Sequence, residues 1–280
     1  MQRWIPPRPD AGEHQEWLRH LPPLPPVPPP APVRSSRRRR VTASVSVFLL
    51  VVLVVSAVLA GAPPRTPTPQ DQTGPTYSFL ETTMSGDPVR WNPCRPIHYV
   101  VNDELAGYST AVADVEEAAQ RVEDATGIDF VYDGVTDEEA SQSRAPYQPA
   151  RYGDEWAPIL IAWTDPDTSP IQFSRGDDVA LGVAAPLYPP HGRFDIYVSG
   201  WVAVNADYPG PGGFDSPSAV GLTVQHELGH VIGMGHTKIY GELMQTSGGG
   251  ALDWGEGDLE GLAQLGRDAG CLVTPEPGQR

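Results

Sequence analysis

Residues 226–236 of this 280-residue chain, which read HELGHVIGMGH, contain the side chains best suited to chemistry. Two histidines four positions apart, His226 and His230, would lie on one face of a helix, so their imidazoles could share one metal ion. Glu227 follows the first histidine and would point beside that ion, where a base can take a proton from a metal-bound water. The pattern H-E-x-x-H-x-x-G-x-x-H therefore predicts three zinc ligands and their base.

Gly233 and His236 complete the predicted site. Glycine accepts left-handed backbone conformations at little cost, so Gly233 lets the chain leave the helix and return His236 to the metal. Three neutral nitrogen ligands leave the fourth position open for water, as in catalytic rather than structural zinc sites. The residues before the motif are apolar at helical spacing (Val220, Leu222, Val224) and predict the helix. The alternative is a buried helix whose histidines only satisfy hydrogen bonds.

A second segment follows the third histidine. Residues 241–245, which read GELMQ, resemble the Met-turn of the metzincin clan of zinc endopeptidases. With the zinc motif, residues 96–271 resemble the matrixin-like branch of that clan, in a membrane-anchored bacterial form. The resemblance implies that Met244 lies beneath the zinc histidines as an apolar, structural floor and is not a ligand.

The function that this resemblance implies is hydrolysis of peptide bonds. One catalytic Zn²⁺ on His226, His230 and His236 would lower the pKa of its bound water toward ~7 and polarise the scissile carbonyl. Glu227 would take the proton of that water and pass it to the leaving amine. Two other functions stay open: a peptidase or amidase acting on cell-wall peptides, and a non-catalytic envelope binding protein. The intact Glu227 argues against the latter, because a pure binder needs no base.

Further metal sites have little support in the sequence. His98 falls in a predicted strand and His191 in a turn. Asp177 and Asp178 could contribute to a structural Ca²⁺ or a second Zn²⁺, as in some relatives of the clan. Without a full ligand set, acidic residues in a solvated loop are the simpler interpretation.

The chain has two cysteines, Cys94 and Cys271, which flank the predicted catalytic domain. Outside the cytoplasm such a pair usually forms a disulfide. Closing a loop of nearly the whole domain would contribute at most about 4–5 kcal/mol in the chain-entropy model. The alternative is that Cys94 is an inhibitory thiolate on the zinc, but residues 92–96 (NPCRP) do not match the matrixin switch sequence.

Charge is distributed unevenly along the chain. The formal net charge is −16, yet residues 1–40 hold eight arginines against three acidic residues. This asymmetry indicates two compartments rather than nucleic-acid binding. The proline-rich run in residues 21–30 cannot pack as helix or sheet, so residues 1–40 are predicted to be a disordered cytoplasmic tail. The tail serves either as a spacer or as a ligand for the aromatic groove of a cytoplasmic partner.

Residues 41–62 carry no charge and are dominated by Val, Leu and Ala. As a helix they span about 33 Å, enough for the hydrocarbon core of a bilayer. The four arginines at positions 37–40 place the N-terminus in the cytoplasm and the rest outside, in a single-pass signal anchor. The alternative is cleavage after Ala62, which would release a secreted form.

The remaining chain divides into three predicted parts. Residues 63–90 are rich in Pro, Thr, Gln, Gly and Ser and are predicted to be an extracytoplasmic stalk, too short for a folded prodomain. Residues 91–272 form the catalytic domain, and residues 273–280 a flexible tail. A peptide or protein substrate, the bilayer and the cytoplasmic partner of the tail are the expected partners.

Apolar runs typical of strands occupy residues 96–101, 128–132, 159–163, 180–184 and 194–198. Helices are expected at residues 109–126, at the zinc motif and at residues 259–265. This order predicts an α+β fold with an α/β-like upper subdomain: a twisted, mixed, mostly parallel sheet with a backing helix and an active-site helix. A small C-terminal subdomain would follow the Met-turn. The resemblance implies that the strand near residues 181–185 borders the cleft and pairs with substrate.

Overall fold

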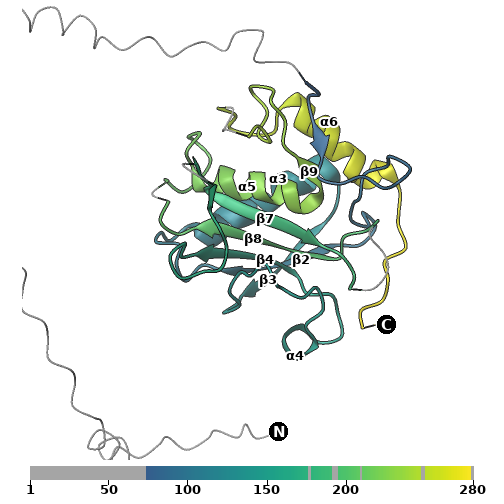
Figure 1. Ribbon diagram of the computed structural model, residues 1–280, viewed down its shortest axis with the longest axis horizontal. Coiled ribbons are helices and arrows are strands. Elements are labelled where there is room, and N and C mark those ends of the chain that lie inside the picture. Colours follow the sequence, from purple (N-terminus) through teal and green to yellow (C-terminus); the bar gives the residue numbers. More distant parts are fainter. Residues whose placement is uncertain (1–73, 176–177, 191–194, 209, 247–249, 279–280) are drawn as a thin grey trace, which may run out of the picture. The chain divides into compact units, whose positions relative to one another are not determined.

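The computed structural model describes residues 74–278 except 176–177, 191–194, 209 and 247–249 (Figure 1). The predicted cytoplasmic tail, the signal anchor and the stalk up to residue 73 lie outside the described residues. Within the described part, no helix has the length and apolar character needed to cross a membrane. The chain divides into two units, Met1–Pro63 and Pro64–Arg280, and every described element belongs to the second.

The core of the domain is a five-stranded sheet with the order β3-β2-β4-β8-β7. Three of its strand pairs are parallel, and β7 pairs antiparallel with β8 at one edge. The strands are β2 (Ile97–Asn102), β3 (Phe130–Val135), β4 (Ile159–Thr164), β7 (Gly182–Leu187) and β8 (Ser199–Asn205). The predicted α+β fold with a mostly parallel mixed sheet is therefore confirmed.

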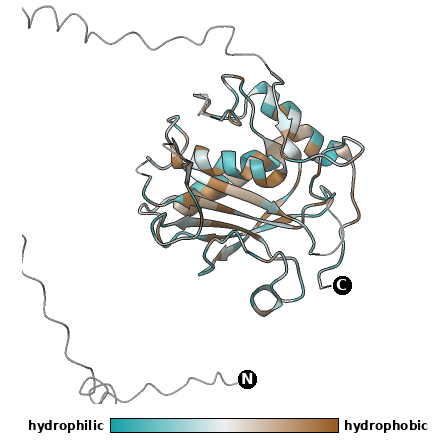
Figure 2. Ribbon diagram, viewed as in Figure 1, coloured by the Kyte–Doolittle hydropathy of each residue, from teal (hydrophilic) through white to brown (hydrophobic). Residues whose placement is uncertain are grey.

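Both faces of the sheet are covered, which explains the continuous apolar run of β4. Ile159, Ile161 and Trp163 belong to the core that includes α3 (Ala111–Thr126) and α5 (Val220–Ile232). Leu160 and Ala162 point the other way and pack with loop residues before β5. A central parallel strand buried on both faces is expected to be apolar throughout rather than alternating. Figure 2 shows this concentration of apolar residues in the sheet.

The smaller elements are β1 (Ser78–Phe79), α4 (Pro149–Tyr152), β5 (Ser174–Arg175), β6 (Asp178–Val179), β9 (Met234–Gly235), α6 (Glu256–Leu265) and the 3-10 turn η2 (Arg267–Ala269). Helix α3 backs α5, as predicted, and ends where Gly127 adopts a left-handed conformation with φ 68°. Helix α6 is the predicted closing helix, and it begins three residues earlier than its apolar periodicity indicated.

The strand predicted at residues 194–198 is displaced along the chain. The ladder strand is β8, and Ile196 forms only an isolated bridge with Arg90. Ser199 and Gly200 read as a break in the sequence, yet both are buried inside β8. Gly200 is required there because a Cβ would lie 2.6 Å from a methyl group of Val231 on α5.

The two cysteines form the predicted disulfide. Cys94 and Cys271 are bonded, with their Cα atoms 5.4 Å apart. A sulfur in this bond is not free to bind zinc, so the alternative of an inhibitory Cys94 thiolate does not hold. The residues after Cys271 also contact the domain, because Asn92 donates to Thr274 Oγ1 and Trp156 donates to the carbonyl of Pro275. The predicted flexible tail is thus tied down over its first residues.

Part of the segment assigned to the stalk belongs to the folded domain. β1 pairs antiparallel with β9, and Val89 is buried in the main core. The folded domain therefore begins near residue 75 rather than at residue 91. No periodic pattern marks this segment, because it is held in part by backbone hydrogen bonds and its polar and apolar side chains do not alternate regularly.

Candidate metal centre

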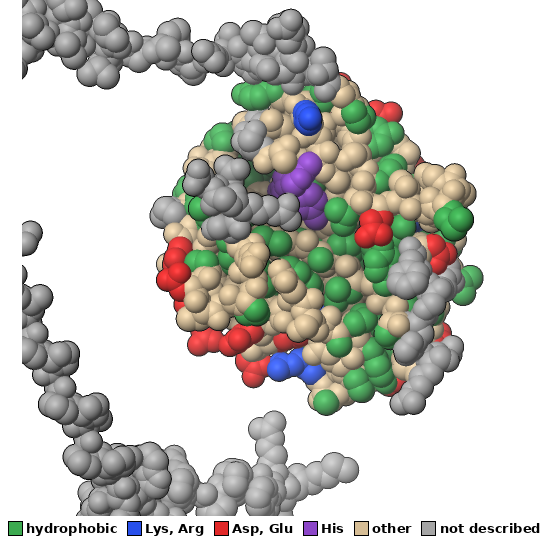
Figure 3. All heavy atoms as spheres, viewed as in Figure 1, with side chains coloured by type: hydrophobic (Ala, Val, Ile, Leu, Met, Phe, Trp, Pro, Cys, Tyr) green, Lys and Arg blue, Asp and Glu red, His purple; other side chains and the backbone are tan. Residues whose placement is uncertain are grey.

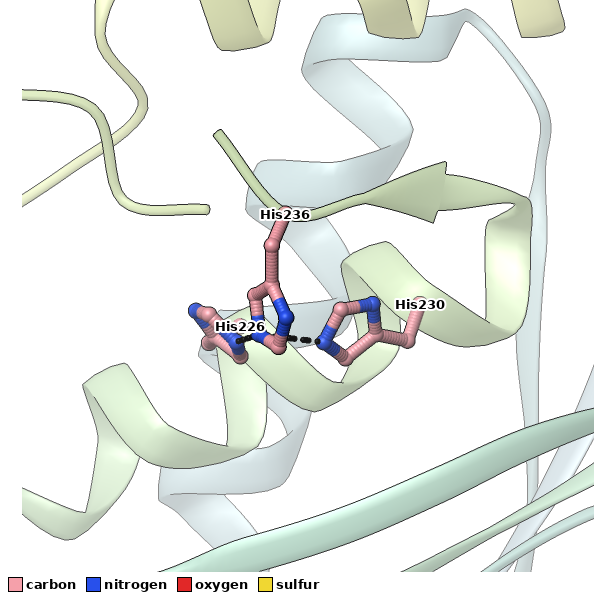
Figure 4. A group of neighbouring side chains, drawn as sticks. All are labelled: His226, His230 and His236. Carbon is pink, nitrogen blue, oxygen red and sulfur yellow. Dashed lines mark hydrogen bonds between the residues drawn. The ribbon is translucent and has the colours of Figure 1, made fainter. Parts of the chain in front are cut away.

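Helix α5 carries two of the three predicted ligands. Its apolar residues are buried on the sheet and on α3, which fixes the face that carries His226 and His230. The helix ends at Gly233, whose φ of 126° suits glycine and whose N–H donates to the carbonyls of Gly229 and His230. The chain then turns back through β9 and places His236 over the helix (Figure 4). The predicted hinge at Gly233 is therefore present.

The three imidazoles converge through their Nε2 atoms (Figure 4). His236 Nε2 lies 3.2 Å from His226 Nε2 and 3.1 Å from His230 Nε2. Two nitrogens bound to a tetrahedral zinc with bonds of 2.0–2.1 Å are about 3.3 Å apart. The spacing of the ring nitrogens thus fits one zinc-sized cation.

The second nitrogen of each α5 histidine fixes its tautomer. His226 Nδ1 lies 2.7 Å from the carbonyl oxygen of Leu243, and His230 Nδ1 lies 2.8 Å from that of Met234. A carbonyl only accepts, so both Nδ1 atoms carry the hydrogen and both Nε2 atoms of the neutral rings present lone pairs. The proton of a neutral His236 could satisfy one of them at best. A cation satisfies all three, and backbone carbonyls commonly orient metal-binding histidines in this way.

Desolvation favours the neutral form of these rings. Desolvation lowers the pKa of His226 to about 4 and that of His230 to about 3, and the neighbouring imidazoles add to the effect. Desolvation also lowers the pKa of His236. Neutral imidazole is the form that binds metals, so the ligands are ready at neutral pH without losing protons. His236 is exposed, and Figure 3 shows histidine side chains reaching the surface.

Glu227 lies in a slot between α5 and the edge strand β7. A Cβ on Gly182 would be 2.6 Å from Glu227 Cγ and 2.9 Å from its Oε1, so the carboxyl group fills the space left by that glycine. Burial raises the pKa of Glu227 to about 8. A carboxyl group poised near neutral pH can both accept and return a proton. Sequence reasoning missed Gly182, because nothing local to β7 marks it as a neighbour of the base.

Met244 is fully buried against α5. A Cβ on Gly229 would lie 2.6 Å from Met244 Sδ, so the sulfur packs on the helix between the two ligand positions. This burial against α5 is compatible with the structural, non-ligand role that the resemblance implied for Met244, which stays a prediction.

Two buried carboxylates hold the turn that contains Met244. Asp258 accepts hydrogen bonds from the backbone N–H groups of Leu243, at 2.5 Å, and Gly255, at 3.1 Å. Glu242 accepts from the N–H groups of Gly257 and Asp258 at the start of α6. Burial, aided by Glu242, raises the pKa of Asp258 to about 6. The turn and α6 thus fix each other, and the carbonyl of Leu243 is held toward His226.

Of the other polar residues singled out in the sequence, His98 is described, and it does not join this centre. His98 is exposed and pairs with Asp133 at 3.0 Å. His191 and Asp177, and the side chain of Asp178, lie outside the described residues. Among the described His, Cys, Asp and Glu residues, only His226, His230 and His236 form a group that could hold a metal ion.

No family model matches this chain, and no curated protein is found to match it either. The interpretation of the centre therefore rests on its own geometry.

Proposed function

We propose that this protein is a zinc-dependent endopeptidase. The observation that carries the proposal is the convergence of three imidazole Nε2 atoms, two of which are fixed as lone-pair donors. Glu227, the residue after His226, adds a buried carboxyl group on the same helix. A structural zinc site would use a fourth protein ligand and would have no need of a base.

The residues of the chain divide the work between them. When bound to His226, His230 and His236, Zn²⁺ supplies a Lewis acid that polarises the scissile carbonyl and acidifies water. Glu227 accepts the proton of the attacking water and donates it to the leaving amine. The slot at Gly182 holds its carboxyl group between α5 and β7. Strand β7 is at the edge of the sheet, and an extended peptide adds to such an edge through backbone hydrogen bonds.

The proposal includes a location outside the cytoplasm. The Cys94–Cys271 disulfide is typical of an oxidising compartment. The domain is tethered to the cell membrane through residues 41–62, with the tail of residues 1–40 in the cytoplasm, or is secreted after cleavage at Ala62. In the tethered form the bilayer, a peptide or protein substrate and a cytoplasmic ligand of the proline-rich tail are its partners.

The test compares the full-length chain with its Glu227→Gln variant, both purified in mild detergent. Zinc content and cleavage of an unstructured protein such as casein are measured for each. We expect one zinc per chain in both proteins and cleavage by the wild type alone. Cleavage of cell-wall peptides but not casein would favour the cell-wall peptidase. Absence of zinc from the wild type would overturn the assignment of the histidines as ligands.

A further inference from the structure

Residues 75–80, which we call the N-terminal strap, lie along the segment that carries the third histidine. In the β1–β9 pair, Ser78 is opposite Gly235 and Phe79 is opposite Met234. The N–H of Leu80 donates to the carbonyl of Gly233 at 2.8 Å. The strap therefore follows the chain from the helix end through the two residues before His236.

The strap also bonds the main chain at and after His236. Ser78 Oγ donates to the carbonyl oxygen of His236 at 2.7 Å. Thr237 Oγ1 donates to the carbonyl of Pro75 at 2.8 Å. The third ligand is thus held through its own carbonyl and through the residue that follows it.

The strap approaches its neighbours so closely that no side chain would fit on the glycines that face it. A Cβ on Gly235 would lie 2.6 Å from Ser78 Oγ and 2.9 Å from the carbonyl oxygen of Phe79. On its other side the strap rests on α6, where a Cβ on Gly257 would lie 2.5 Å from the carbonyl oxygen of Thr76 and Gln264 donates to Tyr77 OH at 2.5 Å. Helix α6 therefore supports the strap, and the strap supports β9.

The three ligands differ in what positions them. His226 and His230 are fixed by helix α5 and by carbonyls that bind their Nδ1 atoms. His236 follows a glycine with positive φ and a two-residue strand, so the helix alone does not determine its place. Contacts from outside α5 must position the third ligand. The strap provides several of them, and the N–H of Thr237 adds one by donating to the carbonyl of Met244.

We propose that the N-terminal strap is a positioning element of the metal centre, with Ser78 as its key side chain. By fixing the main chain of His236, it sets the affinity of the centre for zinc. The proposal rests on the proposed metal site, but not on the identity of the substrate. It implies that any cut of the chain between the strap and the rest of the domain weakens metal binding, although the three histidines and Glu227 stay intact.

Two variants of the full-length chain test this, each with a matched control. Ser78→Ala removes the hydroxyl that bonds His236, and Ser85→Ala removes a hydroxyl that bonds Asp87 within an exposed turn. Leu80→Pro removes the N–H that bonds Gly233, and Leu80→Ala keeps it. The zinc dissociation constant is measured by competition with a chromogenic chelator at pH 7.5.

We expect Ser78→Ala and Leu80→Pro to weaken zinc binding by about tenfold or more, the effect typical of residues that orient metal ligands. Both controls should stay within about twofold of the wild type, since they leave the bonds to the ligand segment intact. The absorption spectrum of bound Co²⁺, which reports ligand geometry, should change in the two test variants alone. A merely structural role would lower the melting temperature of the metal-free protein without altering this spectrum.

The outcomes separate this proposal from the proposed function. Equal zinc affinity and equal Co²⁺ spectra for Ser78→Ala and Ser85→Ala would overturn the role of the strap while leaving the metal site in place. A wild type that binds zinc but cleaves no peptide would overturn the proposed peptidase function. The zinc dissociation constants would still test the role of the strap. A wild type without zinc affinity would overturn both. If Leu80→Pro does not fold, Ser78→Ala decides.

Discussion

The carboxyl group of Glu227 occupies space that is free because Gly182, on the neighbouring strand β7, has no side chain. The slot that holds its carboxyl group is formed by Gly182, two sheet positions from Ala184 on the face toward α5. A side chain at this point would meet the flexible end of Glu227 rather than rigid backbone. The base would then rotate away from the histidines while the fold adjusted little.

Gly182→Ala should therefore separate catalysis from metal binding. We expect peptide cleavage to fall by about 10² or more, the contribution usual for a positioned proton acceptor. Zinc content should stay at the wild-type level, because no ligand is displaced. The matched control is Val183→Ala on the opposite face of β7, which packs away from the base. Full activity in Gly182→Ala would show that the slot does not position Glu227.

The lowered pKa values of the histidines predict a weak pH dependence of metal binding. Because the pKa of His226 is lowered to about 4 and that of His230 to about 3, neither ring takes up a proton in the folded chain as pH falls from 7 to 5.5. Three free histidines with a pKa near 6.5 would lose roughly 10³ in zinc affinity over that interval through proton competition.

We expect the zinc affinity of the folded protein to fall by less than about tenfold between pH 7 and 5.5, because folding has already excluded the competing protons. The same chelator competition, run on the Glu227→Gln variant, measures the ligands without the titration of the base. A loss near the value for free histidines would show that the rings are solvated and that the site is not preorganised.

At the scale of elements, the chain was most predictable where one short segment determines its own structure. The apolar period of α5, the stop at Gly127 and the buried run of β4 are local patterns, and each of them appears as expected. The strand predicted at residues 194–198 was misplaced, because the strand that joins the sheet is β8, which begins at Ser199 and is buried throughout. It missed β1 altogether, since that strand exists only by pairing with Met234 and Gly235, far along the sequence.

The same limit applies to the candidate site. The three-histidine group could be predicted from the sequence, because helical spacing places His226 and His230 on one face. The residues that surround this group could not be predicted. Gly182, Ser78 and Asp258 come near it only through tertiary packing. Asp258 alone left a partial signal, as an acid in the first turn of a helix.

The Asp258 carboxylate joins two elements, so its replacement should affect both. In Asp258→Asn the amide oxygen cannot serve all the N–H groups that the carboxylate accepts, and we expect a loss of about 1–3 kcal/mol in the free energy of unfolding. Zinc affinity should fall as well, since the carbonyl of Leu243 orients His226. Urea unfolding measures the first effect, with exposed Glu260→Gln on the same helix as the control. An unchanged free energy of unfolding would mean that the turn that contains Met244 does not depend on the Asp258 carboxylate.

At the scale of the whole molecule, the covalent link between Cys94 and Cys271 closes nearly the entire domain into one loop, with a sequence separation of 177. Such a link acts mainly on the unfolded chain, whose freedom it reduces. In the folded state the same region is also held by hydrogen bonds, because Arg90 donates to the carbonyls of Ala269 and Gly270. The two ends of the domain therefore stay together in the native state with or without the disulfide.

Replacing both cysteines by serine should consequently lower the free energy of unfolding while leaving the native structure unchanged. We expect the free energy of unfolding to fall by at most about 5 kcal/mol, the chain-entropy value for so long a loop. Zinc content should be retained, since neither sulfur contacts the metal ligands. Urea unfolding of the double variant measures the change, and reduced wild type is the control. An effect on the unfolded chain alone leaves the native ligands in place. A folded double variant with a lower zinc content than the wild type would therefore show that the disulfide shapes the metal centre.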